Sequence, residues 1–402
     1  MRVSTNIVYE QGVSTILRQQ EAALKTQQQV ATGRRILTPA DDPTAAARAL
    51  DVTQAESINQ QYAINRSNAS SALSLTEGVL QGVTTLLQDV RTATVNFGNP
   101  TLTNNDRASL ATELRGRLDE LIGLANTTDG TGQYLFSGYQ GTTKPFTQTA
   151  AGAQYFGDQG QRLVQVAAAR QITVGDSGTD IFERIKNGNG VFATAAGAAN
   201  SGSGVISPGA VVAPASLTGH QYQINFTVAA GTTTYDVVDT TTATTLSAGN
   251  PYTSGNAISF DGLQFDIQGG PANGDRFTVA PSTNQNLFKT LSDLVAVMAA
   301  PVSGQADSTR LTNGLNTALQ NLDHGLDNIL SVRAAVGTRL QEVDALQRTG
   351  EDLALQYQQT LAQLQDVDYA KALSELSRQQ VYLEAAQKSF LKVSGLSLFN
   401  YL

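Results

Sequence analysis

Cysteine is absent from the 402 residues, and the only histidines are His220 and His324. Without cysteine the chain forms no disulfide, no thiolate zinc site and no iron–sulfur site, and it has no thiol nucleophile. Two histidines far apart in sequence exclude a paired-histidine metalloprotease helix and a three-histidine metal site. Solvated or packed histidines are a simpler interpretation than a hydrolase triad. We therefore predict that the chain is not an enzyme and has no cofactor or metal site.

Charge is also sparse, at 15% of residues against about 25% in an average globular protein. The 26 basic and 34 acidic residues give a net charge of -8, and the basic residues form no patch, so nucleic acid is not an expected partner. No run of about 18 apolar residues occurs, and no apolar segment follows Met1. We therefore expect neither membrane insertion nor a cleaved secretory signal.

The acidic pairs have a structural interpretation. Asp41 and Asp42, and Asp366 and Asp368, lack the spacing of a calcium-binding loop, and helix capping explains them more simply. The pair Arg34-Arg35 creates only a weak positive field beside these aspartates. A salt-bridging or subunit-contact role is favoured for it over phosphate or lipid binding.

Glycine, proline and phenylalanine are concentrated in the middle of the chain. Residues 131–290 hold 22 of the 36 glycines, 6 of the 10 prolines and 10 of the 13 phenylalanines, together with threonine-rich runs. This composition is typical of strands and tight turns. The flanking regions are rich in Leu, Ala, Gln, Arg and Glu, which favour helices. We predict an α+β multidomain protein: a long antiparallel helical bundle or coiled coil from both chain ends, with an inserted antiparallel β-rich domain.

Apolar residues in steps of three and four predict long amphipathic helices in both flanks. One stripe runs from Tyr62 to Thr94, and another from Leu315 to Leu364. A shorter helix should begin at Thr103, with Asp106 completing a capping box, and fold back on the first. These stripes are the expected core of a helical bundle.

The periodicity breaks near both ends of the chain. The C-terminal stripe shifts by one residue at Asp366-Val367-Asp368, which predicts a bend or domain crossing. The N-terminal stripe ends at Gly33, a left-handed helix stop, and a new helix should start with Asp42 as N-cap and Pro43 in the first turn. The outermost helices have only each other to cover them, so we expect them to need other subunits.

Alternating apolar and polar residues predict antiparallel strands in the middle region. They cover residues 221–228, 234–237, 258–260 and 263–267, with turns at Asp261-Gly262 and Asn273-Gly274. A Gly/Ala/Ser stretch at residues 193–204 could divide this region into two lobes.

Several long blocks resemble the bacterial flagellin superfamily, and within it the hook–filament junction proteins. These blocks are the opening MRVST, ATGRRILTPADDPTAAARAL at residues 31–50, YLFSGY at 134–139, and DVDYAKALSELSRQQVYLEAAQKSFLKVSGLSLFNYL at 366–402. The resemblance implies a structural subunit that adapts the hook side of the flagellum to the flagellin filament. The implied partners are neighbouring copies in a ring, the hook-side junction protein, flagellin, an export chaperone and the type III export apparatus. The implied location is the extracellular flagellum, reached by secretion without a cleaved signal peptide.

The resemblance also implies layers. Residues 1–43 and 366–402 would form the terminal coiled-coil domain of the inner tube, residues 44–130 and 284–365 a helical bundle domain, and residues 131–283 the β-rich outer domain. The segment from Ala372 to Phe390 would bind the export chaperone, chiefly through Leu376, Leu383 and Phe390. The stripes and the apolar C-terminus give the expected assembly interface, with Leu383 largely exposed in the isolated chain: Ile16, Leu24, Val30, Leu373, Leu376, Leu383, Phe390, Leu398, Phe399 and Leu402.

Two alternative functions stay open at the level of sequence. A flagellin-type filament subunit would share the fold, although the ending GLSLFNYL is more similar to the junction proteins. A carbohydrate-binding or adhesion function of the β-rich insert is a second alternative, and a glycan screen would test it.

Overall fold

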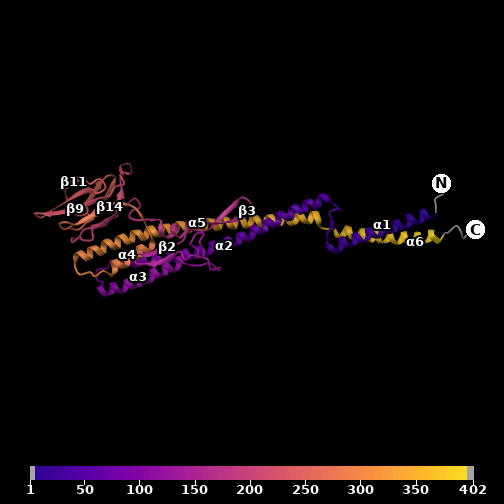
Figure 1. The fold of residues 1–402 in the computed structure, drawn as a ribbon, viewed down its shortest axis with the longest axis horizontal. Helices are drawn as coiled ribbons and strands as arrows, with labels where there is room; N and C mark the ends of the chain where they lie inside the picture. The colour runs from indigo at the N-terminus through magenta and orange to yellow at the C-terminus, as the bar shows by residue number, and fades with distance from the viewer. Residues whose placement is uncertain (1–4, 396–402) are drawn as a thin grey trace, which may run out of the picture. The chain divides into compact units, whose positions relative to one another are not determined.

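The computed structural model describes residues 5–395 and divides into two units, which we treat separately. The terminal unit comprises residues 1–65 and 345–402, and the central unit comprises residues 66–344. The helices are α1 (Thr5–Thr32), α2 (Pro43–Phe97), α3 (Asn104–Ala125), α4 (Leu287–Ala299), α5 (Gln305–Gln365) and α6 (Tyr369–Gly395) (Figure 1). No described helix combines the length and apolarity needed to cross a membrane.

Helices α2 and α5 run antiparallel through the central unit. Arg333 forms an ion pair with Glu77 (2.6 Å), whereas Asp323, earlier in α5, pairs with Arg91, later in α2 (2.5 Å). Within the central unit most residues of both predicted stripes are buried, whereas the part of the second stripe after Gly350 is half-buried. The stripe residues with little or no exposed area are Leu73, Leu80, Val83, Leu87, Val90, Leu315, Leu322, Ile329, Val336 and Val343.

Capping residues determine where the shorter helices α3 and α4 begin. Thr103 and Asp106 form the predicted reciprocal capping box at the start of α3. Helix α4 was not predicted individually, although Asn286 caps it by accepting a hydrogen bond from the Lys289 N–H (2.6 Å). Its apolar residues at four- and seven-residue spacing were the missed signal, and they are buried: Leu287, Leu291, Leu294 and Met298.

The first part of the insert packs onto the helices. It contains β1 (Phe146–Thr149), β2 (Gly152–Tyr155), β3 (Arg162–Ala167), β4 (Arg170–Gly175), the π-helical turn η1 (Thr179–Glu183) and β5 (Ile185–Lys186). Phe136, Phe146 and Phe182 form an aromatic cluster with Phe288 of α4, at centroid distances of 4.7 to 5.6 Å. The core of the helical bundle therefore includes side chains of the insert.

The second part of the insert, residues 188–282, forms a sandwich that we call the β lobe. One sheet has the order β11-β10-β9-β14-β6, and the other has β12-β13-β7 with β8 beside β13, all pairs being antiparallel. The strands are β6 (Phe192–Ala196), β7 (Val205–Ile206), β8 (Ala210–Val211), β9 (Tyr222–Ala229), β10 (Thr232–Asp239), β11 (Thr244–Pro251), β12 (Ala257–Phe260), β13 (Leu263–Gln268) and β14 (Arg276–Pro281), with the 3-10 turn η2 (Pro214–Ser216) before β9.

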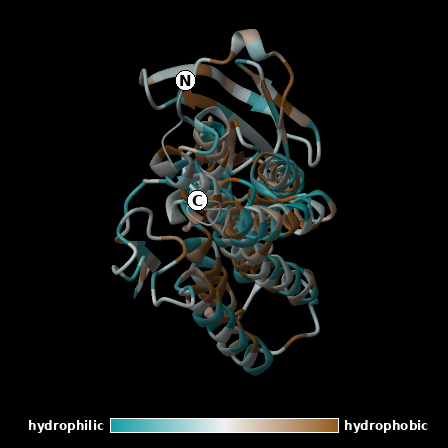
Figure 2. Ribbon diagram, turned by 90° about the vertical axis from the view of Figure 1, so that its right-hand side faces the viewer, coloured by the Kyte–Doolittle hydropathy of each residue, from teal (hydrophilic) through white to brown (hydrophobic). Residues whose placement is uncertain are grey.

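The predicted strands and turns agree with this lobe. Asp261 and Gly262 both have positive φ (46° and 78°), as a tight hairpin turn requires. The stretch at residues 193–204 does not divide the insert, because part of it is β6 and the rest links the two sheets. Figure 2 shows hydrophobic and hydrophilic residues together on the strands and helices, as expected of elements with one buried face.

A neck of two chain segments connects the β lobe to the rest of the central unit, and Asn313 of α5 adds hydrogen bonds to it, accepting from the Ile206 N–H (3.1 Å) and donating to the Gly204 carbonyl (3.1 Å). Strand β15 (Asn284–Gln285) pairs with β5, and the Asn187 N–H donates to the Thr283 carbonyl (3.0 Å). The Thr283 N–H donates back to Asn187 Oδ1 (2.9 Å). Helices from both chain ends and an antiparallel β-rich insert confirm the predicted fold class.

Candidate assembly interface

In the terminal unit, α1 and α6 lie side by side (Figure 1). The shielded residues of each helix recur in steps of four and three, as in a coiled coil. Along α1 they are Gly12, Ile16, Gln19, Ala23, Thr26 and Val30, and along α6 they are Ala372, Leu376, Gln379, Leu383, Ala386 and Phe390. We call these two rows the pairing faces.

An aromatic contact holds the pairing faces together near the chain ends. The Phe390 ring lies 5.1 Å from the Tyr9 ring, centroid to centroid. It also lies over Gly12, where an added Cβ would come within 2.5 Å of the ring. A glycine at this position therefore allows the phenylalanine to approach the α1 backbone.

The residues that follow α1 and the residues between α5 and α6 lie next to each other and are hydrogen-bonded. Gly33 has φ of 71° and ends α1, and its carbonyl accepts from the Val367 N–H (2.9 Å). Arg34 and Asp366 form an antiparallel bridge. The Arg35 side chain donates to the Leu364 carbonyl (2.8 Å) at the end of α5. The sequence correctly predicted both breaks but not that they pair.

Asp41 fastens the loop after α1. Its Oδ2 accepts from the backbone N–H groups of Leu37 and Thr38 (2.9 Å each), and its Oδ1 lies 2.5 Å from Lys25 Nζ. The Lys25 ammonium, followed by these N–H groups, lowers the pKa of Asp41 to about 2. Asp42 caps α2 as predicted, accepting from the Ala45 N–H (3.0 Å). These are structural roles, and no group of three metal-binding side chains occurs among the described residues.

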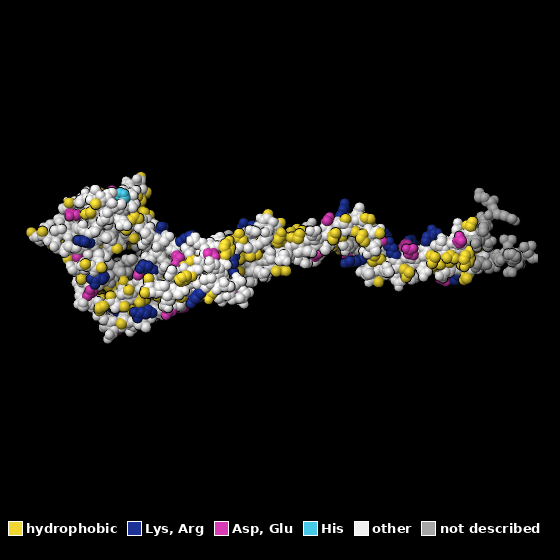
Figure 3. Space-filling model, viewed as in Figure 1, with side chains coloured by type: hydrophobic (Ala, Val, Ile, Leu, Met, Phe, Trp, Pro, Cys, Tyr) yellow, Lys and Arg dark blue, Asp and Glu magenta, His cyan; other side chains and the backbone are white. Residues whose placement is uncertain are grey.

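Outside the pairing faces, both helices carry large apolar side chains exposed to solvent (Figure 3). Leu17 and Leu24 lie on the outer side of α1, where they line a groove with Leu37 and the loop that Asp41 fastens. The exposed apolar residues of α6 are Tyr369, Leu373, Val381, Tyr382, Leu391 and Val393. This surface is the candidate assembly interface.

The sequence-predicted interface residues thus fall into three groups. Ile16, Val30, Leu376, Leu383 and Phe390 lie on the pairing faces and are half-buried. Two more, Leu24 and Leu373, are 52% exposed on the outer surface. The remaining three, Leu398, Phe399 and Leu402, lie outside the described residues.

Leu383 requires a correction. It was expected to be largely exposed in the isolated chain, but α1 covers part of it. The predicted interface followed large apolar residues and therefore grouped Leu373 with Leu376 and Leu383. The true pairing face includes small and polar residues such as Ala372 and Gln379, which give a weak hydrophobic signal.

Comparisons with known proteins agree with this architecture. Residues 3–141 match the profile of the bacterial flagellin N-terminal helical region. Residues 196–281, within the β lobe, match the D2-like domain of flagellar hook-associated protein 1. Paired helices from both chain ends, an inserted β lobe and these two matches define a structural subunit of the flagellin type.

The full-length relatives are more specific. The chain is 31% identical to flagellar hook-associated protein 3 of Salmonella typhimurium and to that of Escherichia coli, over 100% of this chain and 99% of each relative. Hook-associated protein 3 of Legionella pneumophila has a similar crystal structure, with a TM-score of 0.73 and 30% identity, covering 78% of this chain and 98% of that one. The FlgL protein of Xanthomonas campestris gives a TM-score of 0.72 at 29% identity, over 77% and 99%. The chain belongs to the flagellar hook-associated protein 3 family.

The family membership confirms several predictions. The chain is a structural subunit of the bacterial flagellum, of the hook–filament junction type, and it assembles with other flagellar components. Its relatives are structural flagellar proteins rather than enzymes.

Proposed function

We propose that copies of this chain form a ring at the hook–filament junction, held together by the outer surfaces of α1 and α6. The observation that carries this proposal is the exposed apolar surface of the terminal unit, which includes Leu24, Leu373 and Leu391 (69% exposed). A helical pair with apolar residues on both its inner and outer sides is suited to a tube in which each pair packs against its neighbours. The ring contacts the hook-side junction protein on one face and flagellin on the other.

The predicted layers complete this proposal. Residues 1–43 and 366–402 form the innermost layer, residues 44–130 and 284–365 the next, and residues 131–283 the outermost. The different surfaces support this order, because the terminal unit leaves large apolar side chains exposed while the β lobe has its own buried core. The chain functions outside the cell, after export through the flagellar type III apparatus without a cleaved signal peptide.

The export chaperone binds the segment from Ala372 to Phe390. Leu376, Leu383 and Phe390 lie on the face of α6 that α1 covers in the folded chain. A chaperone that uses these residues therefore competes with α1 and binds before the two helices pair. In this way the chaperone keeps the terminal unit open for export, and pairing follows after secretion.

The ring proposal is tested by Leu24→Asp and Leu391→Asp in the native bacterium. Both substitutions place a carboxylate on the outer surface and leave the pairing faces intact, so the purified monomers should unfold in urea like the unmodified chain. In the ring the carboxylate becomes buried without a partner, so cells should shed their filaments. Filament attachment is scored by electron microscopy, and secretion by the amount of the variant in the medium.

Leu246→Asp is the matched control. Leu246 is 44% exposed on β11 of the β lobe. The substitution therefore makes the same chemical change away from the proposed interface. This variant should be secreted and keep its filaments. Normal attachment in both terminal variants would contradict the ring contacts, whereas failed secretion would show that the affected surface is needed for export.

A further inference from the structure

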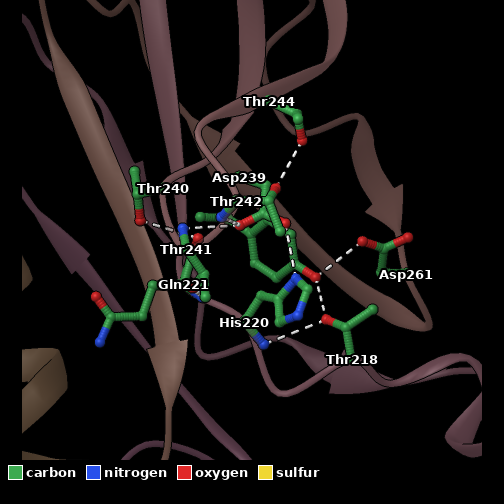
Figure 4. A network of polar contacts seen from close by, with 10 residues as sticks. Thr218, His220, Gln221, Asp239, Thr240, Thr241, Thr242, Thr244 and Asp261 are labelled. Carbon is green, nitrogen blue, oxygen red and sulfur yellow. Dashed lines mark hydrogen bonds and ion pairs between the residues drawn. The ribbon is translucent and has the colours of Figure 1, made fainter.

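A cluster of polar side chains lies at one end of the β lobe (Figure 4). His220 comes from the loop before β9, Tyr222 from the start of β9, and Asp239 from the end of β10. Thr218 lies in the same loop as His220, and Asp261 lies in the turn between β12 and β13. Pairing of β9 with β10 brings Tyr222 beside Asp239, and Asp261 joins them from the other sheet of the sandwich through the Tyr222 hydroxyl.

Asp239 orients the imidazole of His220. Its Oδ2 lies 2.7 Å from His220 Nδ1, while its Oδ1 accepts from the backbone N–H groups of Thr241 (2.8 Å) and Thr242 (3.1 Å). Burial raises the pKa of Asp239, but the hydrogen bonds from Thr242, His220 and Thr241 outweigh it and lower the pKa to about 2. An ionised Asp239 requires a proton on Nδ1. In neutral His220, Nε2 is then an acceptor, and it has no hydrogen bond to any described residue.

Tyr222 and Asp261 form the other half of the cluster. The Tyr222 hydroxyl donates to Asp261 Oδ2 (2.8 Å) and shares a short hydrogen bond with the Thr218 hydroxyl. Burial, together with the Asp261 carboxylate, raises the pKa of Tyr222 to about 12, so the phenol keeps its proton. Asp261 Oδ1 accepts no hydrogen bond from the described part of the chain, which leaves it available to a ligand.

The cluster borders a cavity of about 140 Å³ with an apolar wall. Thr218, His220, Tyr222 and Asp261 line one part of it. Apart from Gly219, the rest of the lining is apolar: Val191, Phe192, Leu217, Leu263, Val279 and Pro281. The cavity is smaller than the roughly 300 Å³ at which pockets for drug-sized ligands begin, so it suits a single small ring.

We propose that this cavity binds one sugar residue of a glycan. A pyranose presents adjacent hydroxyls on its edge and C–H groups on its face, which match the polar and apolar parts of the lining. His220 Nε2 and Asp261 Oδ1 accept hydrogen bonds from two sugar hydroxyls, and Thr218 completes the polar edge. The ring packs against Leu217 and Phe192. The site belongs to the β lobe alone and does not depend on the proposed ring.

Asp261→Asn is the sharpest variant for this site. Asp261 has φ of 46°, in the left-handed region that asparagine adopts more readily than most residues. The side chains have the same shape, and the amide still accepts from the Tyr222 hydroxyl, so the fold should be kept. Only the carboxylate is lost, and with it a charged hydrogen bond to the sugar worth about tenfold in affinity. His220→Gln is a second variant, in which an amide replaces the imidazole ring and its Nε2 acceptor.

The experiment measures binding of a panel of methyl glycosides to the full chain by saturation-transfer NMR and calorimetry. We expect millimolar binding of at least one glycoside, weakened about tenfold or more by Asp261→Asn and by His220→Gln. Asp266→Asn, an equivalent change on β13 outside the cavity lining, is the control and should bind like the unmodified chain. The melting temperature of each variant verifies that it is folded.

Two results would overturn the proposal. If no glycoside binds at millimolar concentration, the cluster serves only to fasten the loops at this end of the lobe. If a glycoside binds but neither variant weakens it, the sugar lies elsewhere on the protein.

Discussion

The two units of this protein bury different kinds of side chain. In the central unit, whole phenylalanines such as Phe146 and Phe288 have no exposed area, and the β lobe adds a second aromatic core. In the described part of the terminal unit, the buried apolar side chains are all alanines: Ala45, Ala49 and Ala372. Its large apolar residues are half-buried at best, and Leu17, Leu24 and Leu391 are mainly exposed.

This difference shows that one amphipathic pattern can serve two purposes. In the central unit the stripes of α2 and α5 are largely buried within the chain, so this unit has a core of its own. In α1 and α6 one row of apolar residues is used in pairing, and a second row stays exposed. Burying a leucine contributes about 1.5 to 3 kcal/mol, so the proposed ring contacts would add to the stability of the terminal unit.

The largest expected effect is the difference in stability between two deletions in the insert. Removing residues 131–283 would take away Phe136, Phe146 and Phe182 and expose Phe288, and each lost phenylalanine costs about 3 to 5 kcal/mol. Replacing residues 188–282 by Asn-Gly would instead close the β5–β15 neck with a two-residue hairpin turn. We expect the shorter deletion to unfold cooperatively in urea, with only a modestly lower midpoint, and the longer one to lose cooperative unfolding.

The two deletions also test where the separable domain begins. Equal stability of the two proteins would show that the aromatic cluster does not belong to the core of the bundle. Loss of folding in the shorter deletion would show that contacts between the β lobe and α5, such as the one from His324 to the Gly188 carbonyl (2.7 Å), are essential.

A smaller effect is expected at Gly12 in the terminal unit. Gly12→Ala places a methyl group where the Phe390 ring lies, so it should loosen the end of the α1–α6 pair by about 1 to 3 kcal/mol. Amide exchange along α6 should become faster, and urea unfolding of the central unit should not change. Gly78→Ala in α2 is the control, because open space surrounds Gly78, and it should stabilise the helix by up to about 1 kcal/mol. Unchanged exchange in Gly12→Ala would contradict the packing of Phe390 on α1.

The smallest expected effect is the pH dependence of the loop held by Asp41, whose ion pair with Lys25 lies on the exposed side of α1. The folded pKa of about 2 lies below the ordinary value of 3.8. The carboxylate therefore favours the folded loop above pH 3.8, and this contribution is lost as the pH falls towards 2. NMR titration of the Asp41 carboxyl carbon should give a midpoint near 2, and Lys25→Met should move it upward. A midpoint near 3.8 in the unmodified chain would mean that the loop is not fastened to α1 in solution.

The sequence predicted those features that depend on local periodicity and capping. Both long stripes, the Thr103 capping box, the Asp261-Gly262 turn and the breaks at Gly33 and Asp366 follow from patterns within a few residues. The features that escaped prediction depend on residues distant in sequence. The aromatic cluster joins Phe136 to Phe288, and no spacing rule relates them.

The candidate interface was predictable in part for the same reason. Periodicity identified Leu376, Leu383 and Phe390 as one stripe, but it could not assign a stripe to the partner helix or to a neighbouring chain. The role of Gly12 was not predicted. This glycine leaves space for Phe390, and a residue without a side chain does not contribute to a hydrophobic pattern. In the β-lobe cluster, His220 and Asp261 come together only because the two sheets of the sandwich pack on each other.

The paired breaks between α1 and α2 and between α5 and α6 have a mechanical consequence. Sliding one segment along the other would break the Val367–Gly33 hydrogen bond, the Arg34–Asp366 bridge and the Arg35–Leu364 bond together. Bending at this level needs only small dihedral changes in the few non-helical residues of each segment. The α1–α6 pair can therefore tilt as a unit while its register is retained. In the proposed ring, such a joint would let the α1–α6 pair of a subunit change its angle while keeping its contacts with neighbouring copies.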